Sequence, residues 1–325
     1  MRAIIPVAGV GSRLKPHTHT LPKVLLNVGD KPILGHIISK LLDSGINRAT
    51  FITGYLGDKI KEYVSSAFPE LDALYVEQES LDGLGHAIYT AAPTFDDDEI
   101  FIILGDTIFD VDLNTFFNSD TNVLGLKEVE NPTRFGVAIV EGGRIRKLVE
   151  KPRVPPSKLA IVGLYYIKNA GALFKALNTL VEKNIRTQGE LQLTDALQLM
   201  IDSGEAFSPY LIEGWYDCGK PETLLSTNQY LLSIRSSHPQ IETCVINEPV
   251  YIDETAEVSN CVLGPYTTIG ANCKVSDSII RNTIVAPGAN VEKCLFDNSI
   301  IGTNSVIRGK YTRMNTGDSS EIDIN

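Results

Sequence analysis

The sequence has no long hydrophobic run, although hydrophobic residues make up 43% of its 325 residues. No apolar stretch approaches the ~18 residues that a membrane-spanning helix requires, so no membrane partner is expected. The first apolar stretch ends after about seven residues and leads into glycines, Arg13 and Lys15, which are not the flanks of a secretory signal peptide. We therefore expect a globular cytoplasmic protein.

Cysteine and positive charge are both scarce. The five cysteines form no C-x-x-C pair, a pattern that argues against a zinc site and against a disulfide framework. The formal net charge is −11. Because binding to a long nucleic acid requires a basic stripe, no nucleic-acid partner is expected. A small phosphorylated substrate requires only a local positive pocket, which this composition permits.

Up to about residue 235, short apolar runs alternate with segments of helical spacing. This alternation predicts an α/β fold with a Rossmann-like, mostly parallel sheet flanked by helices, in which ligands bind at the carboxyl ends of the strands. Residues 127–168 differ and indicate an antiparallel insertion around a Gly142-Gly143 turn, and a helix is expected from about 189 to 203. The expected parallel strands are residues 3–7, 49–53, 73–77, 99–104 and 122–126.

Beyond about residue 243 the helical spacing stops, and aliphatic residues recur at six-residue steps, as in Leu263, Ile269 and Val275. A period of six indicates a parallel β-helix, although steps of five and ten residues interrupt it and leave a plain antiparallel sheet as the alternative. We predict two domains, a catalytic domain over residues 1–235 and a small β-helix over 243–325. Coils of this kind bury few side chains, so a homo-oligomer (dimer or tetramer) is expected.

The segment VAGVGSRLKPHTHTLPK, residues 7–23, directly follows the first expected strand. Gly9 and Gly11 allow backbone N–H groups to approach an anion closely, and Arg13 can grip phosphate oxygens with two N–H groups. Position 14 is leucine, so the third glycine of a dinucleotide-binding fingerprint is missing, and the lysine-serine/threonine ending of a Walker loop is also absent. The loop therefore predicts a phosphate site of another kind.

The full pattern G-x-G-S-R-L-x-P-x-x-x-x-x-P-K resembles the signature of the sugar-1-phosphate nucleotidylyltransferases, the nucleotide-sugar pyrophosphorylases. Further motifs follow in the order of that family and extend the resemblance over essentially the whole chain. The thymidylyl- and uridylyltransferases of glucose 1-phosphate are the most similar, and residues after 243 resemble a hexapeptide-repeat left-handed β-helix. The further motifs are LDGLGHA after Gln78, LGD at a strand end, RFGV, EKP followed by GLY, and WYDCG.

The resemblance implies an enzyme that joins a nucleoside triphosphate to a sugar 1-phosphate. A sugar-phosphate oxygen would attack the α-phosphorus in line and release pyrophosphate, a reaction that depends on alignment and charge neutralisation. The implied substrates are dTTP or UTP with glucose 1-phosphate. The alternatives are a mannose-1-phosphate guanylyltransferase and, in another class, a non-catalytic regulatory subunit that binds nucleotide-sugar.

The resemblance also implies roles for single residues. Arg13, Lys23, Asp106 and Asp217 would be catalytic, and the two aspartates would bind Mg²⁺, which prefers hard oxygen ligands. The nucleotide would be bound by Ala8, Gly9, Gly11, Ser12, Arg13, Gln78 and Gly83, and the sugar phosphate by Gly136, Glu150, Lys151 and Gly163.

Three other features of the sequence qualify this assignment. Asp110-Val-Asp112 is a rival aspartate pair, but Asp112 is expected to cap the helix that begins at LNTFF. His86 is expected to be solvated or structural rather than catalytic. Val162 stands where thymidylyltransferases usually have threonine, which leaves the identity of the sugar open.

Overall fold

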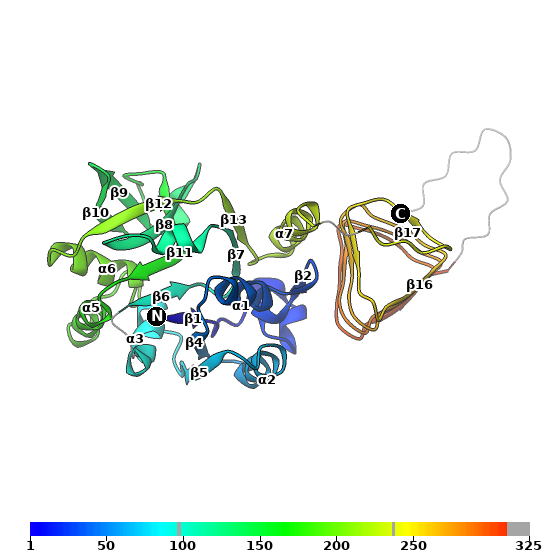
Figure 1. The fold of residues 1–325 in the computed structure, drawn as a ribbon, viewed down its shortest axis with the longest axis horizontal. Coiled ribbons are helices and arrows are strands. Elements are labelled where there is room, and N and C mark those ends of the chain that lie inside the picture. The colour runs from blue at the N-terminus through cyan, green and yellow to red at the C-terminus, as the bar shows by residue number, and fades with distance from the viewer. Residues whose placement is uncertain (96–98, 236–237, 311–325) are drawn as a thin grey trace. The chain divides into compact units, whose positions relative to one another are not determined.

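The computed structural model of the chain describes residues 1–95, 99–235 and 238–310 (Figure 1). The chain divides into two compact units. Unit 1 comprises residues 1–27 and 31–227, and unit 2 comprises residues 28–30 and 228–325. The boundary at residue 228 falls within helix α7 (Pro221–Ser233). None of the described helices is long and apolar enough to cross a bilayer.

A nine-stranded mixed sheet forms the centre of unit 1. Its parallel half consists of β6 (Ile100–Ile103), β1 (Arg2–Pro6), β4 (Arg48–Thr53) and β5 (Asp72–Glu77), in that order. The central strands are short continuous apolar runs because the sheet is covered on both faces, and Ile4 is fully buried. These four strands match four of the five predicted parallel strands, and the expected α/β class is confirmed.

The other half of the sheet is largely antiparallel. Strand β11 (Leu159–Ile167) pairs antiparallel with β6 and with β8 (Asn122–Glu128). The predicted insertion is the hairpin of β9 (Val137–Glu141) and β10 (Arg144–Val149), whose two turn glycines have φ of 58° and 74°. Strand β8 was expected to be one of the parallel strands. It is parallel to only one of its two neighbours, since it runs parallel to β12 (Phe207–Leu211) and antiparallel to β11.

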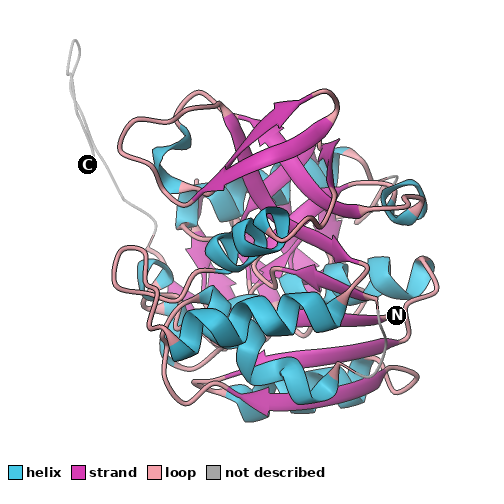
Figure 2. Ribbon diagram, turned by 90° about the vertical axis from the view of Figure 1, so that its left-hand side faces the viewer, coloured by secondary structure: helices cyan, strands magenta, loops and turns pink. Residues whose placement is uncertain are grey.

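Helices flank the sheet, as Figures 1 and 2 show. One buried cluster joins the sheet to three helices and includes Ile4, Ile88, Leu173 and Leu197. The helices are α1 (Ile33–Asp43), α2 (Gly57–Ala67), α3 (Leu84–Ala91), α4 (Leu113–Phe117), α5 (Ala170–Glu182) and α6 (Leu193–Asp202). Shorter paired elements are β2 (Asn27–Val28), β3 (Lys31–Pro32), β7 (Thr107–Asp110) and β13 (Gly214–Asp217).

Two helix starts test the sequence prediction directly. Asp112 caps α4, because its side chain accepts a hydrogen bond from the backbone N–H of Asn114 at 3.0 Å, as predicted. The expected start of α6 near residue 189 is wrong. Gln188 and Gly189 have φ of 54° and 86°, a left-handed conformation that a helix cannot contain, so α6 begins only at Leu193.

Unit 2 is built around a three-sided parallel β-helix, which Figure 1 shows nearly along its axis. Each side is a four-stranded parallel sheet, as expected for the hexapeptide-repeat left-handed β-helix. The first sheet contains β14 (Val245–Ile246), β17 (Val262–Leu263), β20 (Ile279–Arg281) and β23 (Leu295–Asp297). The second contains β15 (Val250–Ile252), β18 (Thr267–Ile269), β21 (Ile284–Val285) and β24 (Ile300–Ile301), and the third β16 (Glu257–Ser259), β19 (Lys274–Ser276), β22 (Asn290–Glu292) and β25 (Val306–Arg308).

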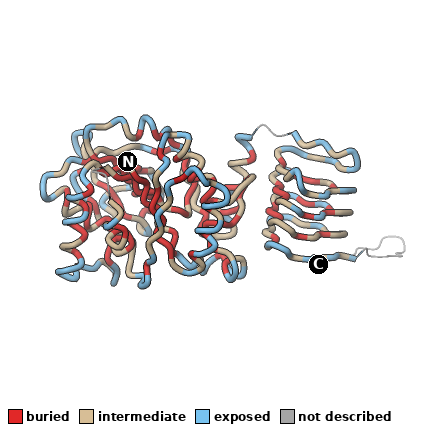
Figure 3. Tube along the Cα trace, turned by 60° about the horizontal axis from the view of Figure 1, so that its bottom comes forward, coloured by how far each residue is buried: buried red, intermediate tan, exposed pale blue. Residues whose placement is uncertain are grey.

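The register of these sheets explains the irregular six-residue period. Val245 pairs with Val262 and Val262 with Ile279, so each of these coils has 17 residues, whereas Ile279 pairs with Leu295 after 16. Three full six-residue sides would require about 18 residues, and the shorter coils produce the five-residue steps seen in the sequence. Buried residues recur along every coil (Figure 3).

Candidate active site

The glycine-rich loop begins at the carboxyl end of β1, directly after Pro6. A Cβ atom added at Gly9 would meet no atom within 4 Å, so the backbone there is open to a ligand. Gly11 has φ of 67°, and a Cβ atom at this position would lie 2.9 Å from Cβ of Lys23. The loop therefore folds back on itself and places Lys23 beside its second glycine.

The other predicted residues of this loop differ in exposure. Ala8 is buried, whereas Ser12 and Arg13 are exposed. A hydroxyl and a guanidinium are thus accessible at the end of the strand where ligands bind in α/β sheets.

Strand pairing brings the two predicted metal ligands together. In the antiparallel pair of β7 and β13, Asp217 lies opposite Thr107. The backbone N–H of Cys218 also donates a hydrogen bond to the carbonyl oxygen of Asp106 at 3.1 Å. Burial and the nearby Asp106 carboxylate raise the pKa of Asp217 above its usual value. Two carboxylates that are far apart in the sequence therefore share one site.

The two predicted basic residues lie beside these carboxylates. Lys23 Nζ forms an ion pair with Asp106 Oδ2. A Cβ atom at Gly219 would lie 2.9 Å from both Arg13 Nη2 and Asp217 Oδ1, so this glycine leaves room for the arginine and the aspartate to approach each other. The charges of Lys23 and Arg13 lower the pKa of Asp217 and so oppose the effect of burial.

The chemistry of Asp106 and Asp217 fits Mg²⁺. Two neighbouring carboxylates repel each other until a cation neutralises them, and Mg²⁺ typically binds through one or two carboxylates while keeping several waters. Among the described residues, no group of three or more His, Cys, Asp or Glu side chains could hold a metal ion. The donor set therefore suits a site completed by water and phosphate oxygens, rather than a cage made only of protein.

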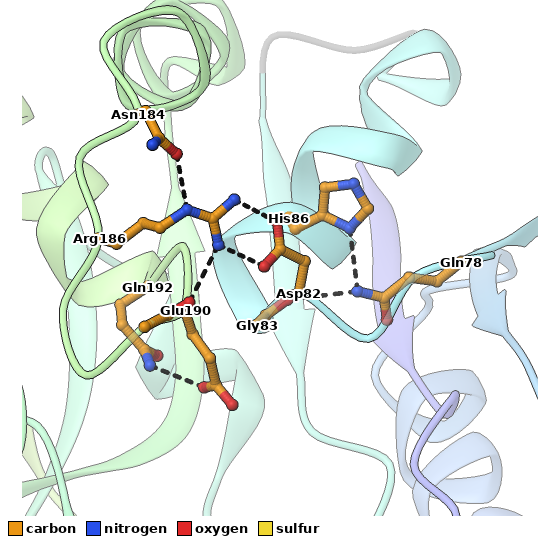
Figure 4. Close-up of polar contacts among 9 residues, drawn as sticks. Gln78, Asp82, Gly83, His86, Asn184, Arg186, Glu190 and Gln192 are labelled. Atoms are coloured by element: carbon orange, nitrogen blue, oxygen red, sulfur yellow. Dashed lines mark hydrogen bonds and ion pairs between the residues drawn. The ribbon is translucent and has the colours of Figure 1, made fainter.

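Gln78 and Gly83 lie between the end of β5 and the start of α3 (Figure 4). The side-chain Nε2 of Gln78 donates to the carbonyl oxygen of Gly83 at 3.3 Å and lies 3.2 Å from Nδ1 of His86. The Gly83 carbonyl can only accept a hydrogen bond, so it fixes which end of the Gln78 amide faces it. Gln78 Oε1 accepts no hydrogen bond from any residue in the described parts of the chain.

The predicted sugar-phosphate residues form a second polar cluster. Glu150 is largely buried, and its Oε2 accepts a hydrogen bond from Thr194 Oγ1 at 2.7 Å. Lys151 Nζ lies 3.3 Å from Glu150 Oε1. A Cβ atom at Gly136 would lie 2.9 Å from both Glu150 Oε2 and Thr194 Oγ1, so only glycine leaves the space over this carboxylate free.

Gly163 differs from the other predicted glycines. A Cβ atom there would lie 2.5 Å from the Leu104 side chain, so the space beside Gly163 is taken by protein. Its role towards the sugar stays a prediction.

The motifs did not point to Thr194 or to the contact between His86 and Gln78. Thr194 is 44 residues from Glu150, and a threonine in the first turn of a helix gives no sign of such a partner. His86 was expected to be structural or solvated, and the structure gives it a specific partner in Gln78.

Known protein families and relatives match this chain over nearly its whole length. The family model of nucleotidyl transferases matches residues 2–234, and that of the GMPPB C-terminal domain matches residues 246–319. The low-salt glycan biosynthesis nucleotidyltransferase Agl11 of Haloferax volcanii is 32% identical over 362 residues, which cover 100% of both chains. A glucose-1-phosphate thymidylyltransferase of Streptomyces antibioticus is 30% identical over 361 residues, which cover 100% of this chain and 99% of that one.

Solved structures show the same fold. A UDP-glucose pyrophosphorylase complexed with UDP-glucose has a TM-score of 0.61 and 25% sequence identity. The alignment covers 72% of this chain and 99% of that chain.

Proposed function

This chain belongs to the nucleotidyl transferase family, as its motifs predicted, and on that premise we propose that it transfers a nucleotidyl group to a hexose 1-phosphate. The products are an NDP-sugar and pyrophosphate. The favoured triphosphates are dTTP and UTP, and the favoured acceptor is glucose 1-phosphate. Catalysis belongs to residues 1–235, and the β-helix of residues 243–325 contributes none of the proposed site residues.

The observation that carries this proposal is the convergence of Arg13, Lys23, Asp106 and Asp217. In the proposed reaction, a sugar-phosphate oxygen forms a bond to the α-phosphorus. The bond from that phosphorus to the α,β-bridging oxygen breaks, and pyrophosphate leaves with the electron pair. Arg13 and Lys23 stabilise the negative charge that develops on the leaving oxygens.

The remaining requirements are a cation and a fixed acceptor. Asp106 and Asp217 would hold Mg²⁺, which neutralises phosphate charge and orients the triphosphate. Glu150 would accept hydrogen bonds from sugar hydroxyls, and Lys151 would bind the sugar phosphate. Holding both reactants in line contributes much of the rate of such a transfer.

The orientation of Gln78 supports the choice of base. Its free Oε1 can accept a hydrogen bond from a ring N–H, which uracil and thymine carry at N3. Cytosine and adenine present an acceptor at the corresponding edge and would face this oxygen unfavourably. A site that leaves a buried polar group unpaired with the wrong ligand discriminates strongly.

A second candidate is guanylyl transfer to mannose 1-phosphate. The match of residues 246–319 to the GMPPB C-terminal domain favours it, and guanine also carries a ring N–H. That match lies outside the residues proposed for base recognition, so guanylyl transfer ranks second. A non-catalytic regulatory subunit ranks lower, because such a protein has no need for the complete set of charged residues. A homo-oligomeric assembly and a cytoplasmic location stay predictions.

The test is pyrophosphate release from each of five triphosphates (dTTP, UTP, GTP, CTP and ATP) with four sugar 1-phosphates (glucose, mannose, galactose and N-acetylglucosamine) in the presence of Mg²⁺. We expect activity with dTTP or UTP, weak activity with CTP and ATP, and loss of activity in Arg13→Ala. Preference for GTP with mannose 1-phosphate would select the second candidate. Absence of pyrophosphate with all twenty pairs, in protein that still binds an NDP-sugar, would overturn the enzyme proposal.

A further inference from the structure

The segment of residues 184–192, which connects α5 to α6, lies directly against the loop proposed to bind the base (Figure 4). The backbone N–H of Leu191 donates to the carbonyl oxygen of Asp82 at 3.0 Å, and the N–H of Gly85 donates to the carbonyl oxygen of Leu191 at 2.8 Å. A Cβ atom at Gly83 would lie 2.5 Å from the same Leu191 oxygen. The two segments are therefore in backbone contact on both sides of Gly83.

Arg186 adds a side-chain contact between the same two segments. Its Nη1 and Nη2 bind the two carboxylate oxygens of Asp82 in bidentate geometry, the second at 2.8 Å. Nε also donates to Asn184 Oδ1 at 2.6 Å, and Nη1 donates to the carbonyl oxygen of Gly189 at 3.0 Å. The hydrogen bonds from Arg186 lower the pKa of Asp82. Because its own segment already holds the guanidinium at two points, the pair of N–H groups that binds Asp82, here called the fork, is preorganised for this carboxylate.

The tip of this segment is a tight turn. Thr187 and Glu190 exchange backbone hydrogen bonds of 3.0 and 3.2 Å. The two residues between them, Gln188 and Gly189, have positive φ, as in the type I′ turn of a hairpin. Gln188 Nε2 also donates to the carbonyl oxygen of Lys151 at 3.2 Å. The segment is thus anchored at its tip, and the ion pair joins this anchored turn to the base-binding loop.

We propose that Arg186 is a positioning residue for base recognition, an inference that rests on the proposed nucleotidyl transfer. Its fork on Asp82 holds the neighbouring Gly83, whose carbonyl oxygen in turn orients the Gln78 amide. Loss of the fork frees the backbone that should contact the base and loosens Gln78. The four residues proposed to be catalytic are not part of this chain of contacts, so binding of the triphosphate should suffer more than the chemical step.

The test is steady-state kinetics of Arg186→Met with the best substrate pair of the unaltered protein. We expect KM for the triphosphate to rise about 5- to 10-fold, while kcat and KM for the sugar 1-phosphate change less than about 2-fold. The matched control is Arg281→Met, which breaks a partly exposed pair with Asp297 in the β-helix and should change none of these constants. Arg186→Lys keeps the charge without the fork and should retain most of the defect.

Base discrimination separates positioning from mere support of the fold. In Arg186→Met, the ratio of kcat/KM for the preferred triphosphate to that for CTP should fall at least about 3-fold, because Gln78 is no longer fixed. If Arg186→Met fails to fold, Asp82→Asn, which keeps the size of the side chain and removes its charge, should give the same shifts.

Three results would overturn the inference. The first is an unchanged KM for the triphosphate in a folded Arg186→Met or Asp82→Asn protein. The second is an equal rise in both KM values. The third is a loss confined to kcat. If the unaltered protein is active, each of these results contradicts only the positioning role of Arg186 and does not contradict the proposed nucleotidyl transfer. An unaltered protein that is inactive with every substrate pair defeats the proposed function and the inference together.

Discussion

The two units contain arginine–aspartate pairs of similar chemistry in very different surroundings. In the β-helix, Arg281 binds Asp297, and these residues are also register partners in neighbouring coils, 16 positions apart. In unit 1, Arg186 binds Asp82 across 104 positions. In a repeat structure each residue meets its equivalent in the next repeat, so such a pair follows from the period. The pair in unit 1 follows only from the way the chain is folded.

Residues with positive φ show a related difference between the asparagine corners of the β-helix and Gly83 in unit 1. In the β-helix they recur at the corners and are often asparagine, as at Asn272 and Asn304, because the short amide side chain tolerates this conformation. In unit 1 they include Gly83, where a side chain would also collide with the backbone at Leu191. At the asparagine corners the chain thus uses a conformation that a short side chain tolerates, whereas Gly83 occupies a place where the neighbouring backbone also excludes a side chain. Gly264 in the β-helix is of this second kind, because a Cβ atom there would collide with the carbonyl oxygen of Asn247.

Removal of a carboxylate from the proposed site is the strongest test of the difference between the two units. Asp217→Asn should lower kcat about 10³-fold, because the cation and the developing charge lose a preorganised partner. The melting temperature should stay unchanged or rise, since the carboxylate is partly buried and repelled by Asp106, as its raised pKa indicates. Pyrophosphate release and thermal unfolding measure the two effects. The control Asp297→Asn should change neither kcat nor KM.

An Asp217→Asn protein that is both inactive and strongly destabilised would contradict this reasoning. The aspartate would then support the fold rather than the reaction.

The next largest effect is expected in the core of the β-helix. Leu263 is fully buried, and Leu263→Ala should lower the free energy of unfolding of this unit by about 3 kcal/mol through lost contacts and a cavity. Because none of the proposed site residues lies in the β-helix, kcat should stay within about 2-fold. The matched control is Leu295→Ala, at a leucine that is 77% exposed, which should cost less than about 0.5 kcal/mol.

Urea unfolding followed by pyrophosphate release below the first transition measures both quantities. Activity lost in step with Leu263→Ala unfolding would show that catalysis depends on the β-helix, and the separation of the two units by function would be wrong.

The parts of the fold that were predictable from the sequence are those with a local signal. Apolar runs marked β1, β4, β5 and β6, and the six-residue spacing marked the β-helix. The start of α6 was not predictable, because the turn that delays it has Gln188 in a left-handed conformation, and glutamine carries no signal for one. The coil lengths of 16 and 17 residues were visible only as interruptions of the period.

The residues of the site also divide into those that the sequence could identify and those that it could not. Arg13, Lys23, Asp106 and Asp217 could be named because they belong to motifs with a fixed order, and the structure brings them together. Thr194 and Arg186 could not be named, because each acts on a residue in a distant segment and neither lies in one of the motifs that carry the family resemblance. Pairing between loops is decided by the packing of α5 and α6 on the sheet, which the spacing of residues within each loop does not encode.

The smallest effect concerns a single corner of the β-helix. Asn272 is exposed and has φ of 55°, and its side chain makes no hydrogen bond to a described residue, so a substitution there changes only the backbone preference. Asn272→Ala should lower the free energy of unfolding by about 1 kcal/mol, the cost of a left-handed conformation for alanine. Asn272→Gly should be neutral within about 0.5 kcal/mol, because the equivalent corner of the next coil is already Gly288. Equal unfolding midpoints in urea for the alanine and glycine variants would mean that backbone conformation does not limit the corner, and that the asparagines recur there for a reason other than φ.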